Sequence, residues 1–239
     1  MTRINKYLAE CGVCSRREAD KLIEQKRVTV NGEKAVSGMQ VCDLDCVEVN
    51  GKKVKAVSEK VVLAYYKPVG ITCTEKDRHA EKTIVEAINY PARLTYAGRL
   101  DKESEGLILM TNDGELIQCM MKGANRHEKE YLVKVDKEIT KEFLMEMSKG
   151  VYLKELDETT RPCKIQQIGK FTFKIVLTQG LNRQIRRMCA CFGYGVKSLT
   201  RIRVMNIELA GLKYGAYREL STEELSKLYQ LCGMGKYRK

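Results

Sequence analysis

The chain is poor in histidine and has no long apolar run. Two histidines in 239 residues supply too few ligands for a histidine-rich metal centre and leave serine or cysteine triads thinly supported. Apolar runs such as residues 61–66 are far shorter than the roughly 20 residues that a membrane-spanning helix needs. Residues 1–6 are not followed by the apolar core of a signal peptide, and no internal repeat or low-complexity stretch is present. We therefore expect a soluble, cytoplasmic protein.

Cysteine, in contrast, is abundant. Ten cysteines without a secretory signal indicate reduced thiols in a reducing compartment and not a disulfide scaffold. Cys11 and Cys14 form a C-x-x-C pair, to which Cys42 and Cys46 could in principle add two further zinc ligands. Neither pair has a zinc-knuckle context and both have apolar neighbours, so we predict small buried thiols there instead.

The composition is basic. Lys and Arg number 43 against 31 Asp and Glu, which gives a net charge of +12 and a pI of about 9.2. Such a surface binds a polyanion through phosphate contacts and counterion release, so nucleic acid is the expected partner. The cations are mostly interleaved with acids, and only residues 236–239 resemble a basic tail, so folded surfaces must carry the binding.

The length allows two domains, and the first sixty residues read as a small α/β unit. Thr2 can cap a helix with Ile4 on its apolar face, and Ser15 to Glu18 is a capping box. The pairs Asn31-Gly32 and Asn50-Gly51 each predict a tight hairpin turn after a short strand. Charged residues without an amphipathic pattern then follow. We predict a front domain over 1–55, a linker over 56–60 and a second domain over 61–239.

The second domain alternates strands and helices irregularly. Periodicity predicts strands over 61–66, 106–110, 131–135, 171–177 and 202–207. Helices are expected near 84–88 after a Thr83 cap, 114–120, 141–148, 183–192, and 223–231 after Ser221. This pattern indicates an α+β domain with a mixed, mainly antiparallel sheet and flanking helices.

Two segments concentrate polar residues that could do chemistry. The first, 97–114, sets Asp101 between Arg99 and Lys102 just before an apolar strand; taken alone, such an acid is usually solvated. In the second, 179–188, a strand gives way to a helix whose first N–H groups can meet phosphate. Helical spacing places Arg183 and Arg187 on one face and turns Arg186 elsewhere, although a solvated basic helix remains the plain alternative.

Three segments of the front domain belong together: 4–12, Ser15-Arg16-Arg17-Glu18-Ala19 and Val28-Thr29-Val30-Asn31-Gly32. With them the front domain resembles an S4 RNA-binding domain. This resemblance implies that Arg16 and Arg17 contact RNA phosphates. Cations at a helix start oppose the helix dipole, so stability alone does not explain them.

The second domain contains four ordered motifs, Lys67-Pro68-Val69-Gly70, Gly98-Arg99-Leu100-Asp101, Glu128-Lys129-Glu130-Tyr131 and 180–188. With these motifs the domain resembles the RsuA type of pseudouridine synthase, and their wording is most similar to the RluF-like branch, which acts on large-subunit rRNA. The resemblance implies that Asp101 is the catalytic aspartate and Arg186 its ion-pair partner. It also implies that Tyr131 packs on the target uracil and that Leu199 forms the apolar wall. For RNA binding we select Arg99, Lys102, Leu181, Asn182, Arg183, Gln184, Arg187, Arg201 and Arg203, in addition to Arg16 and Arg17.

The resemblance implies isomerisation of a uridine in structured rRNA, with large-subunit rRNA as the first expectation and tRNA as a further substrate class. The reaction is redox-neutral and needs no cofactor or metal. No membrane or obligate protein partner is implied, and we expect a monomer.

Two alternatives stay open. A non-catalytic ribosome-assembly protein would explain the charge but not the Asp101 set. A glycosidase would pair Asp101 with Glu103 or Glu105, yet such acids should face each other across a cleft.

Overall fold

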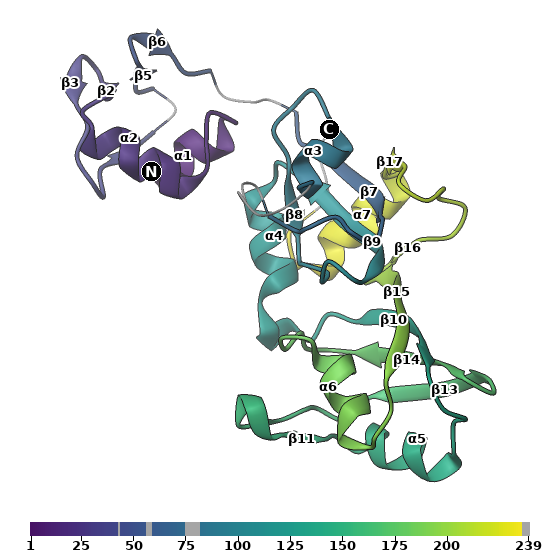
Figure 1. Ribbon diagram of the computed structural model, residues 1–239. Coiled ribbons are helices and arrows are strands. Elements are labelled where there is room, and N and C mark those ends of the chain that lie inside the picture. The colour runs from purple at the N-terminus through teal and green to yellow at the C-terminus, as the bar shows by residue number, and fades with distance from the viewer. Residues whose placement is uncertain (43, 56–58, 75–81, 236–239) are drawn as a thin grey trace.

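The computed structural model describes residues 1–42, 44–55, 59–74 and 82–235 (Figure 1). The predicted linker at 56–60 therefore lies partly, and the basic tail at 236–239 wholly, outside the described residues. No helix within the described ranges is long and apolar enough to cross a membrane.

The N-terminal unit, residues 1–55, packs two helices on short strands. Helices α1 (Ile4–Glu10) and α2 (Arg16–Glu24) cover a four-stranded sheet in the order β3-β2-β5-β6. Its strands are β2 (Val28–Val30), β3 (Glu33–Lys34), β5 (Val47–Val49) and β6 (Lys52–Lys53), and β1 (Thr2–Arg3) pairs separately with β4 (Gln40–Val41). Ile4, Leu8, Ile23, Val28 and Val47 lie in its apolar core.

Local signals in this unit are largely confirmed. Ser15 and Glu18 form the predicted capping box at the start of α2. Asn31 and Gly32 have φ of 53° and 87°, and the Asn50-Gly51 pair is also left-handed, as tight turns of this type require. The expected Thr2 cap is wrong: Thr2 pairs with Val41, and α1 begins after Arg3, which makes no side-chain cap. Pairing holds Thr2 in β1, one residue too early to cap.

The main unit, from residue 59, is built on one large mixed sheet. Its strand path is β13-β14-β10-β15-β9-β7-β17, with β8 beside β9 and β16 beside β15. The bounds are β7 (Val62–Lys67), β8 (Thr95–Ala97), β9 (Glu105–Thr111), β10 (Lys129–Val135), β13 (Lys164–Gly169), β14 (Thr172–Leu177), β15 (Val196–Val204), β16 (Ile207–Glu208) and β17 (Tyr217–Glu219). A separate ribbon pairs β11 (Tyr152–Leu153) with β12 (Glu158–Thr159). All sheet pairs are antiparallel except β15 with β9. The predicted mixed, mainly antiparallel architecture is therefore confirmed.

Two apolar cores lie on opposite faces of the sheet. Helices α3 (Ile84–Ile88), α5 (Lys141–Ser148) and α6 (Gln184–Cys191) contribute to one, and α4 (Gly114–Met121) and α7 (Thr222–Leu231) to the other. Short 3₁₀ turns occupy Gly123–Asn125 and Lys154–Leu156. Residues of β9 alternate between the cores: Ile108 and Met110 enter the first, Leu107 and Leu109 the second. A strand covered on both faces reads as one continuous apolar run, which is how 106–110 looks in the sequence.

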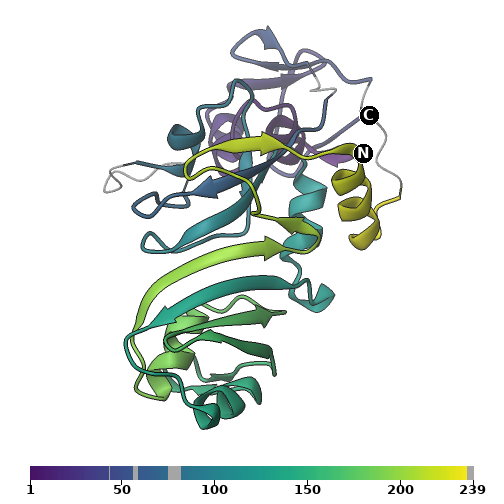
Figure 2. The ribbon, with the colours of Figure 1, turned by 90° about the vertical axis from the view of Figure 1, so that its right-hand side faces the viewer.

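The parallel contact joins the two halves of the sheet. Strand β15 runs from the half with β10, β13 and β14 to the half with β7 and β9, as Figure 1 shows. It pairs with β9 over only two positions, Thr200 with Glu105 and Arg201 with Gly106. The predicted strand over 202–207 is wrong in extent, because the chain reverses at Met205, which has a φ of 53°, and returns as β16. The edge view in Figure 2 shows both halves, with the teal α4 beside the yellow α7.

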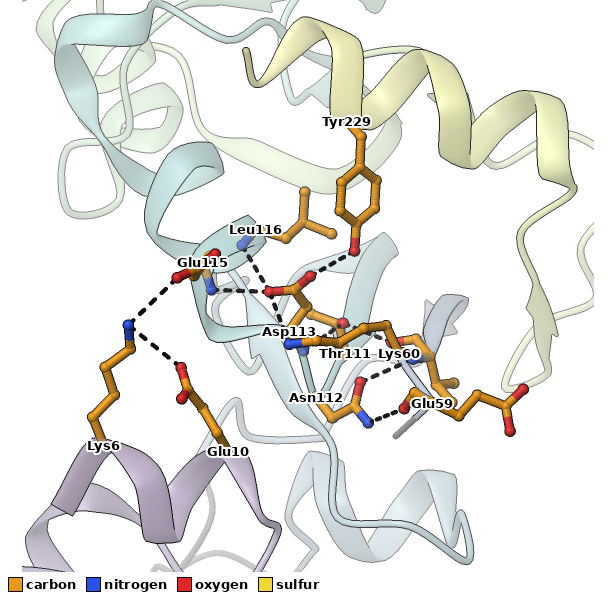
Figure 3. A network of polar contacts seen from close by, with 11 residues as sticks. Lys6, Glu10, Glu59, Lys60, Thr111, Asn112, Asp113, Glu115, Leu116 and Tyr229 are labelled. Atoms are coloured by element: carbon orange, nitrogen blue, oxygen red, sulfur yellow. Dashed lines mark hydrogen bonds and ion pairs between the residues drawn. The ribbon is translucent and has the colours of Figure 1, made fainter. Parts of the chain in front are cut away.

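Ion pairs connect the N-terminal unit to α4 (Figure 3). Lys6 of α1 lies 3.5 Å from both Glu10 of the same helix and Glu115 of α4. Asp113 caps α4 and also accepts a 2.6 Å hydrogen bond from the Tyr229 hydroxyl of α7. The start of α4 therefore contacts both the N-terminal unit and the C-terminal helix.

Candidate active site

Asp101 lies in a loop at the junction of the two half-sheets. The loop, residues 98–104, connects β8 to β9 and begins at Gly98, whose φ is 88°. Two hydrogen bonds shape it: Leu100 N donates to Cys73 Sγ at 3.4 Å, and Ser104 N donates to the Asp101 carbonyl at 3.0 Å. Leu100 is buried, whereas the Asp101 side chain is 29% exposed. The loop backbone is therefore held by hydrogen bonds, while the Asp101 carboxylate remains accessible from solvent.

The turn at 67–70 holds this loop in place through hydrogen bonds. Lys67 is fully buried, and its Nζ donates to the Pro68 and Ser104 carbonyls at 2.7 Å each. Gly70 N donates to the Lys102 carbonyl at 2.8 Å. Lys67 stands in one of the matching motifs, but no role was predicted for it. Its ammonium bonds one carbonyl of the turn and one carbonyl of the loop, so it holds the two segments together.

Burial lowers the pKa of Lys67 to about 8, against the weaker opposing effect of Cys73. The unfolded chain keeps its proton up to an ordinary lysine pKa, so between pH 8 and about 10.5 it binds more protons than the folded state. The unfolding free energy should therefore rise across this window and be independent of Lys67 below it. We expect chemical denaturation to give a steeper rise for the wild type than for Lys67→Met. Equal slopes would contradict the lowered pKa of Lys67 in the folded protein.

Two arginines face the Asp101 carboxylate. Arg183 Nη1 and Arg186 Nε each lie 3.9 Å from Asp101 Oδ2. The Arg186 head group is held by the Val196 and Glu103 carbonyls and by Ser104 Oγ, all at 3.3 Å. Its Nε is buried and has no hydrogen-bond partner among the residues that the structure describes. This donor faces the carboxylate slightly beyond hydrogen-bond range, so a small closing motion would satisfy it.

The predicted division of arginine faces is wrong in part. Arg183 is not a helical residue but the left-handed residue that precedes α6, with a φ of 50°. This conformation turns its guanidinium towards Asp101 and towards Glu103, which it contacts at 2.8 Å. Arg183 and Arg186 therefore converge on one carboxylate. The periodicity predicted a helix starting at 183 with Arg183 on the same face as Arg187, so this convergence with Arg186 was not expected.

Tyr131 and Leu199 lie on the adjacent strands β10 and β15. Their exposed fractions are 9% and 6%, and both pack in the same apolar cluster as Leu100 and Ile185. Tyr131 is opposite Arg201 in the register, and Leu199 is opposite Val133. The cluster brings the ring and the leucine to the core beside the loop that carries Asp101.

Arg201 and Gln184 do not lie at an RNA-accessible surface, which corrects their assignment as RNA contacts. Arg201 is 1% exposed; its Nε donates to the Leu107 carbonyl at 2.6 Å and its Nη1 to the Arg99 carbonyl at 3.4 Å. Gln184 is 4% exposed and accepts from Leu181 N. Arg201 therefore bonds backbone carbonyls of β9 and of the Asp101 loop, and Gln184 bonds the backbone just before α6, so both side chains hold the site in shape.

The remaining predicted RNA residues differ in availability. Arg203 bonds Glu130 at 2.9 Å and Glu128 at 3.0 Å and is 21% exposed, so its assignment as an RNA contact stays a prediction. Arg187 is held by Asn182 and by an ion pair with Glu155. Leu181 is half-buried. The exposed members of the set are Arg99, Lys102, Asn182, Arg183, Arg16 and Arg17.

Arg16 also lines a cavity between the two units. This cavity, of about 350 Å³, has Ser15 and Glu10 on one side and Arg93, Asn112 and Gln118 on the other. Asp101 is not among its lining residues. The cations Arg16 and Arg93 face a shared space that is separate from the carboxylate.

Comparisons with known proteins agree with these motifs. Residues 61–191 match the RNA pseudouridylate synthase family, and residues 2–45 match the S4 domain. The dual-specificity RNA pseudouridine synthase RluF of Escherichia coli (strain K12) is 48% identical over 231 residues, which are 96% of this chain and 79% of the relative. The ribosomal large subunit pseudouridine synthase B of Bacillus subtilis is 35% identical and covered over 99% of both chains. A crystal structure of a pseudouridylate synthase superposes with a TM-score of 0.71 at 28% identity, over 95% of this chain and all of that one.

Proposed function

Because this chain belongs to the RNA pseudouridylate synthase family, we propose that it converts a uridine of structured large-subunit rRNA to pseudouridine, with tRNA as a second substrate class. The observation that carries the proposal is the carboxylate of Asp101, reachable and faced by Arg183 and Arg186. The relatives named for RluF have dual specificity, and this supports the two substrate classes. The domain division is part of the proposal: RNA binding over 1–55, a linker over 56–60 and catalysis over 61–239.

The reaction breaks the bond between uracil N1 and the ribose and joins C5 to the same ribose carbon. N1 gains a proton and C5 loses one, so no electron donor or external group is consumed. Asp101 supplies the reacting carboxylate, which the guanidinium groups of Arg183 and Arg186 face, while the stacked base excludes water. Tyr131 provides the flat face for the ring and Leu199 the apolar wall. No step requires a cofactor or a metal.

The uridine must leave its stack before it can reach Asp101. Arg99, Lys102 and Asn182 are exposed around the loop and can hold the backbone of a flipped nucleotide. The N-terminal unit adds Arg16 and Arg17 on a second surface. An enzyme that binds at two places reads RNA shape over a distance, as structured rRNA and tRNA demand. We place this activity in the cytoplasm, in ribosome biogenesis, and in a monomer.

Pseudouridine mapping tests the substrate. Ribosomal RNA and tRNA from cells with and without the gene should differ at one or a few uridines. We expect the missing modifications in large-subunit rRNA and in tRNA. Full modification of both RNA classes without the gene, with no activity of the purified protein on either transcript, would overturn the proposal and favour a binding protein of ribosome assembly.

Arg186→Met should lower kcat by about 10² to 10³-fold, the usual effect of removing one preorganised donor at a reacting charge. The methionine keeps the volume but leaves Asp101 with Arg183 alone. Arg186→Lys keeps a charge but lacks the Nε–H, so its kcat should lie between those of the wild type and Arg186→Met. Single-turnover kinetics with saturating rRNA transcript measure the effect.

Arg187→Ala is the matched control on the same helix, because Arg187 bonds Asn182 and Glu155 and not Asp101. It should change the RNA concentration needed and leave kcat within a few-fold. If Arg187→Ala lost kcat while Arg186→Met kept it, the arginine assignment would be reversed.

Replacing both Arg16 and Arg17 by alanine should weaken RNA binding in a salt-dependent way. Each phosphate contact contributes about 0.7 to 0.9 to the slope of log K against log salt, so the slope should fall by about 1.5. Filter binding at several salt concentrations measures it, with Arg3→Ala/Lys34→Ala as a control of equal charge change. An unchanged slope would show that the N-terminal unit does not hold the substrate through these residues.

A further inference from the structure

A cluster of metal-ligating side chains lies away from Asp101, where α4 and α7 meet. Cys119 is in the last turns of α4, His127 follows the 3₁₀ turn at Gly123–Asn125, and Cys232 ends α7. Within the part of the chain that the structure describes, these are the only three side chains of the metal-ligating types whose donor atoms gather closely, all within 4.8 Å of one another. All three are half-buried. Three separate elements thus deliver two sulfurs and one imidazole to one point.

We propose that Cys119, His127 and Cys232 bind one zinc ion. Zinc prefers thiolate and imidazole ligands, at about 2.3 Å and 2.0 to 2.1 Å, in a tetrahedral arrangement. A sulfur and a nitrogen on the same ion therefore lie about 3.6 Å apart, and the distance from Cys119 Sγ to His127 Nε2 is 3.7 Å. Softer ligands of this kind disfavour magnesium and calcium. A water completes the fourth position, as it does in other two-cysteine, one-histidine sites.

Neighbouring groups already orient the cluster. Cys119 Sγ donates to the Cys232 carbonyl at 3.3 Å, and Asn125 Nδ2 donates to Cys119 Sγ at 3.4 Å and to its carbonyl at 2.9 Å. A donor aimed at a ligating sulfur is the usual second support of a thiolate on zinc. When the ion binds, the two thiols release their protons to solvent and the two resulting negative charges neutralise the metal.

The site would brace the C-terminal helix. The other end of the α4–α7 contact is already closed by Tyr229 and Asp113 (Figure 3). A bond between Cys119 and Cys232 through zinc would close the second end, one turn further along α7. Met121, two residues after Cys119, packs 3.2 Å from the position of a Cβ at Gly98, the first residue of the Asp101 loop. The ion would thus fix the end of α4 that lies beside the first residue of that loop.

Cobalt titration of the full-length protein under a non-thiol reductant tests the site. We expect one Co²⁺ per chain with thiolate-to-cobalt absorption, and displacement by Zn²⁺. The variant Cys119→Ser/Cys232→Ser should lose the absorption and weaken affinity by about 100-fold or more, since even supporting groups cost 10 to 100-fold. The single variant His127→Gln, which keeps both sulfurs, should weaken Co²⁺ binding. The control Cys42→Ser/Cys46→Ser removes two cysteines of the N-terminal unit and should bind as the wild type does.

Hydrogen exchange tests the site without relying on the thiolate-to-cobalt absorption. Zinc should slow exchange over 222–235 in the wild type and in the Cys42→Ser/Cys46→Ser control, but not in Cys119→Ser/Cys232→Ser. The proposal is overturned if the wild type binds no Co²⁺ under reductant, if the cluster variants bind it unchanged, or if the control loses it. It does not depend on the proposed rRNA substrate, because none of these measurements uses RNA.

Discussion

Asp101→Asn should abolish pseudouridine formation, with a loss of at least about 10⁴-fold in the single-turnover rate, comparable to removal of a central reacting group in other enzymes. The amide keeps the shape of the side chain but carries no negative charge and is a poor nucleophile and base. RNA affinity should stay within a few-fold, because the exposed cations around the loop are untouched. Rate measurements with saturating transcript, together with filter binding, separate the two effects.

Glu103→Gln is the control for this substitution. Glu103 stands in the same loop, is more exposed than Asp101, and already bonds Arg183 at 2.8 Å. An account based on Asp101 alone predicts a loss of less than about 10-fold for Glu103→Gln. A glycosidase-like pair would need both acids across a cleft. Equal inactivation by the two variants would support such a pair and contradict the assignment.

Gly106→Ala should destabilise the protein by about 3 kcal/mol or more. Gly106 has a φ of 113°, and an added Cβ would lie 2.3 Å from the Arg201 carbonyl oxygen and 2.5 Å from its nitrogen. Both contacts are with backbone of β15, so relief requires the only parallel strand pair of the described sheet to separate. Such a cost is a large share of the 5 to 15 kcal/mol that a domain has. Chemical denaturation measures it.

Gly211→Ala separates the effect of the contact from that of the backbone angle. Gly211 also has a positive φ, 75°, but nothing lies within 4 Å of its added Cβ. We expect it to cost about 1 kcal/mol, the strain of a left-handed alanine. If both variants were equally destabilised, the close approach of β9 and β15 would not be the cause.

Local rules predicted what depends on a few neighbouring residues. Ser15 and Glu18 form the predicted capping box, and helices begin after Thr83 and Ser221 as expected, where Glu86 and Glu224 complete capping boxes too. Helix 141–148 is found with the expected bounds, since Thr140 caps it and Phe143 and Met147 share one buried face. The family was also identifiable, because its motifs are short contiguous segments. Each of these signals lies within a few positions in the chain.

Features that depend on distant pairing were missed. Arg201 was assigned to RNA because its charge is visible in the sequence, whereas its burial follows from the β9–β15 pairing, which joins positions 95 residues apart. Arg183 was placed on a helix face because periodicity does not register one left-handed residue. Lys67 had no recognised role, because the carbonyl of Ser104 that it bonds is 37 residues away. Tertiary contacts, not propensities, decided all three.

The most direct test of the proposed catalysis follows the hydrogen on C5 of uracil. Isomerisation replaces that hydrogen by the bond to ribose, so large-subunit rRNA transcript labelled with tritium at C5 should release one tritium to water for each uridine converted. We predict release in proportion to enzyme turnover with the wild type and none above background with Asp101→Asn at equal RNA occupancy. Tight binding without release by the wild type, or equal release by both proteins, would contradict catalysis by Asp101.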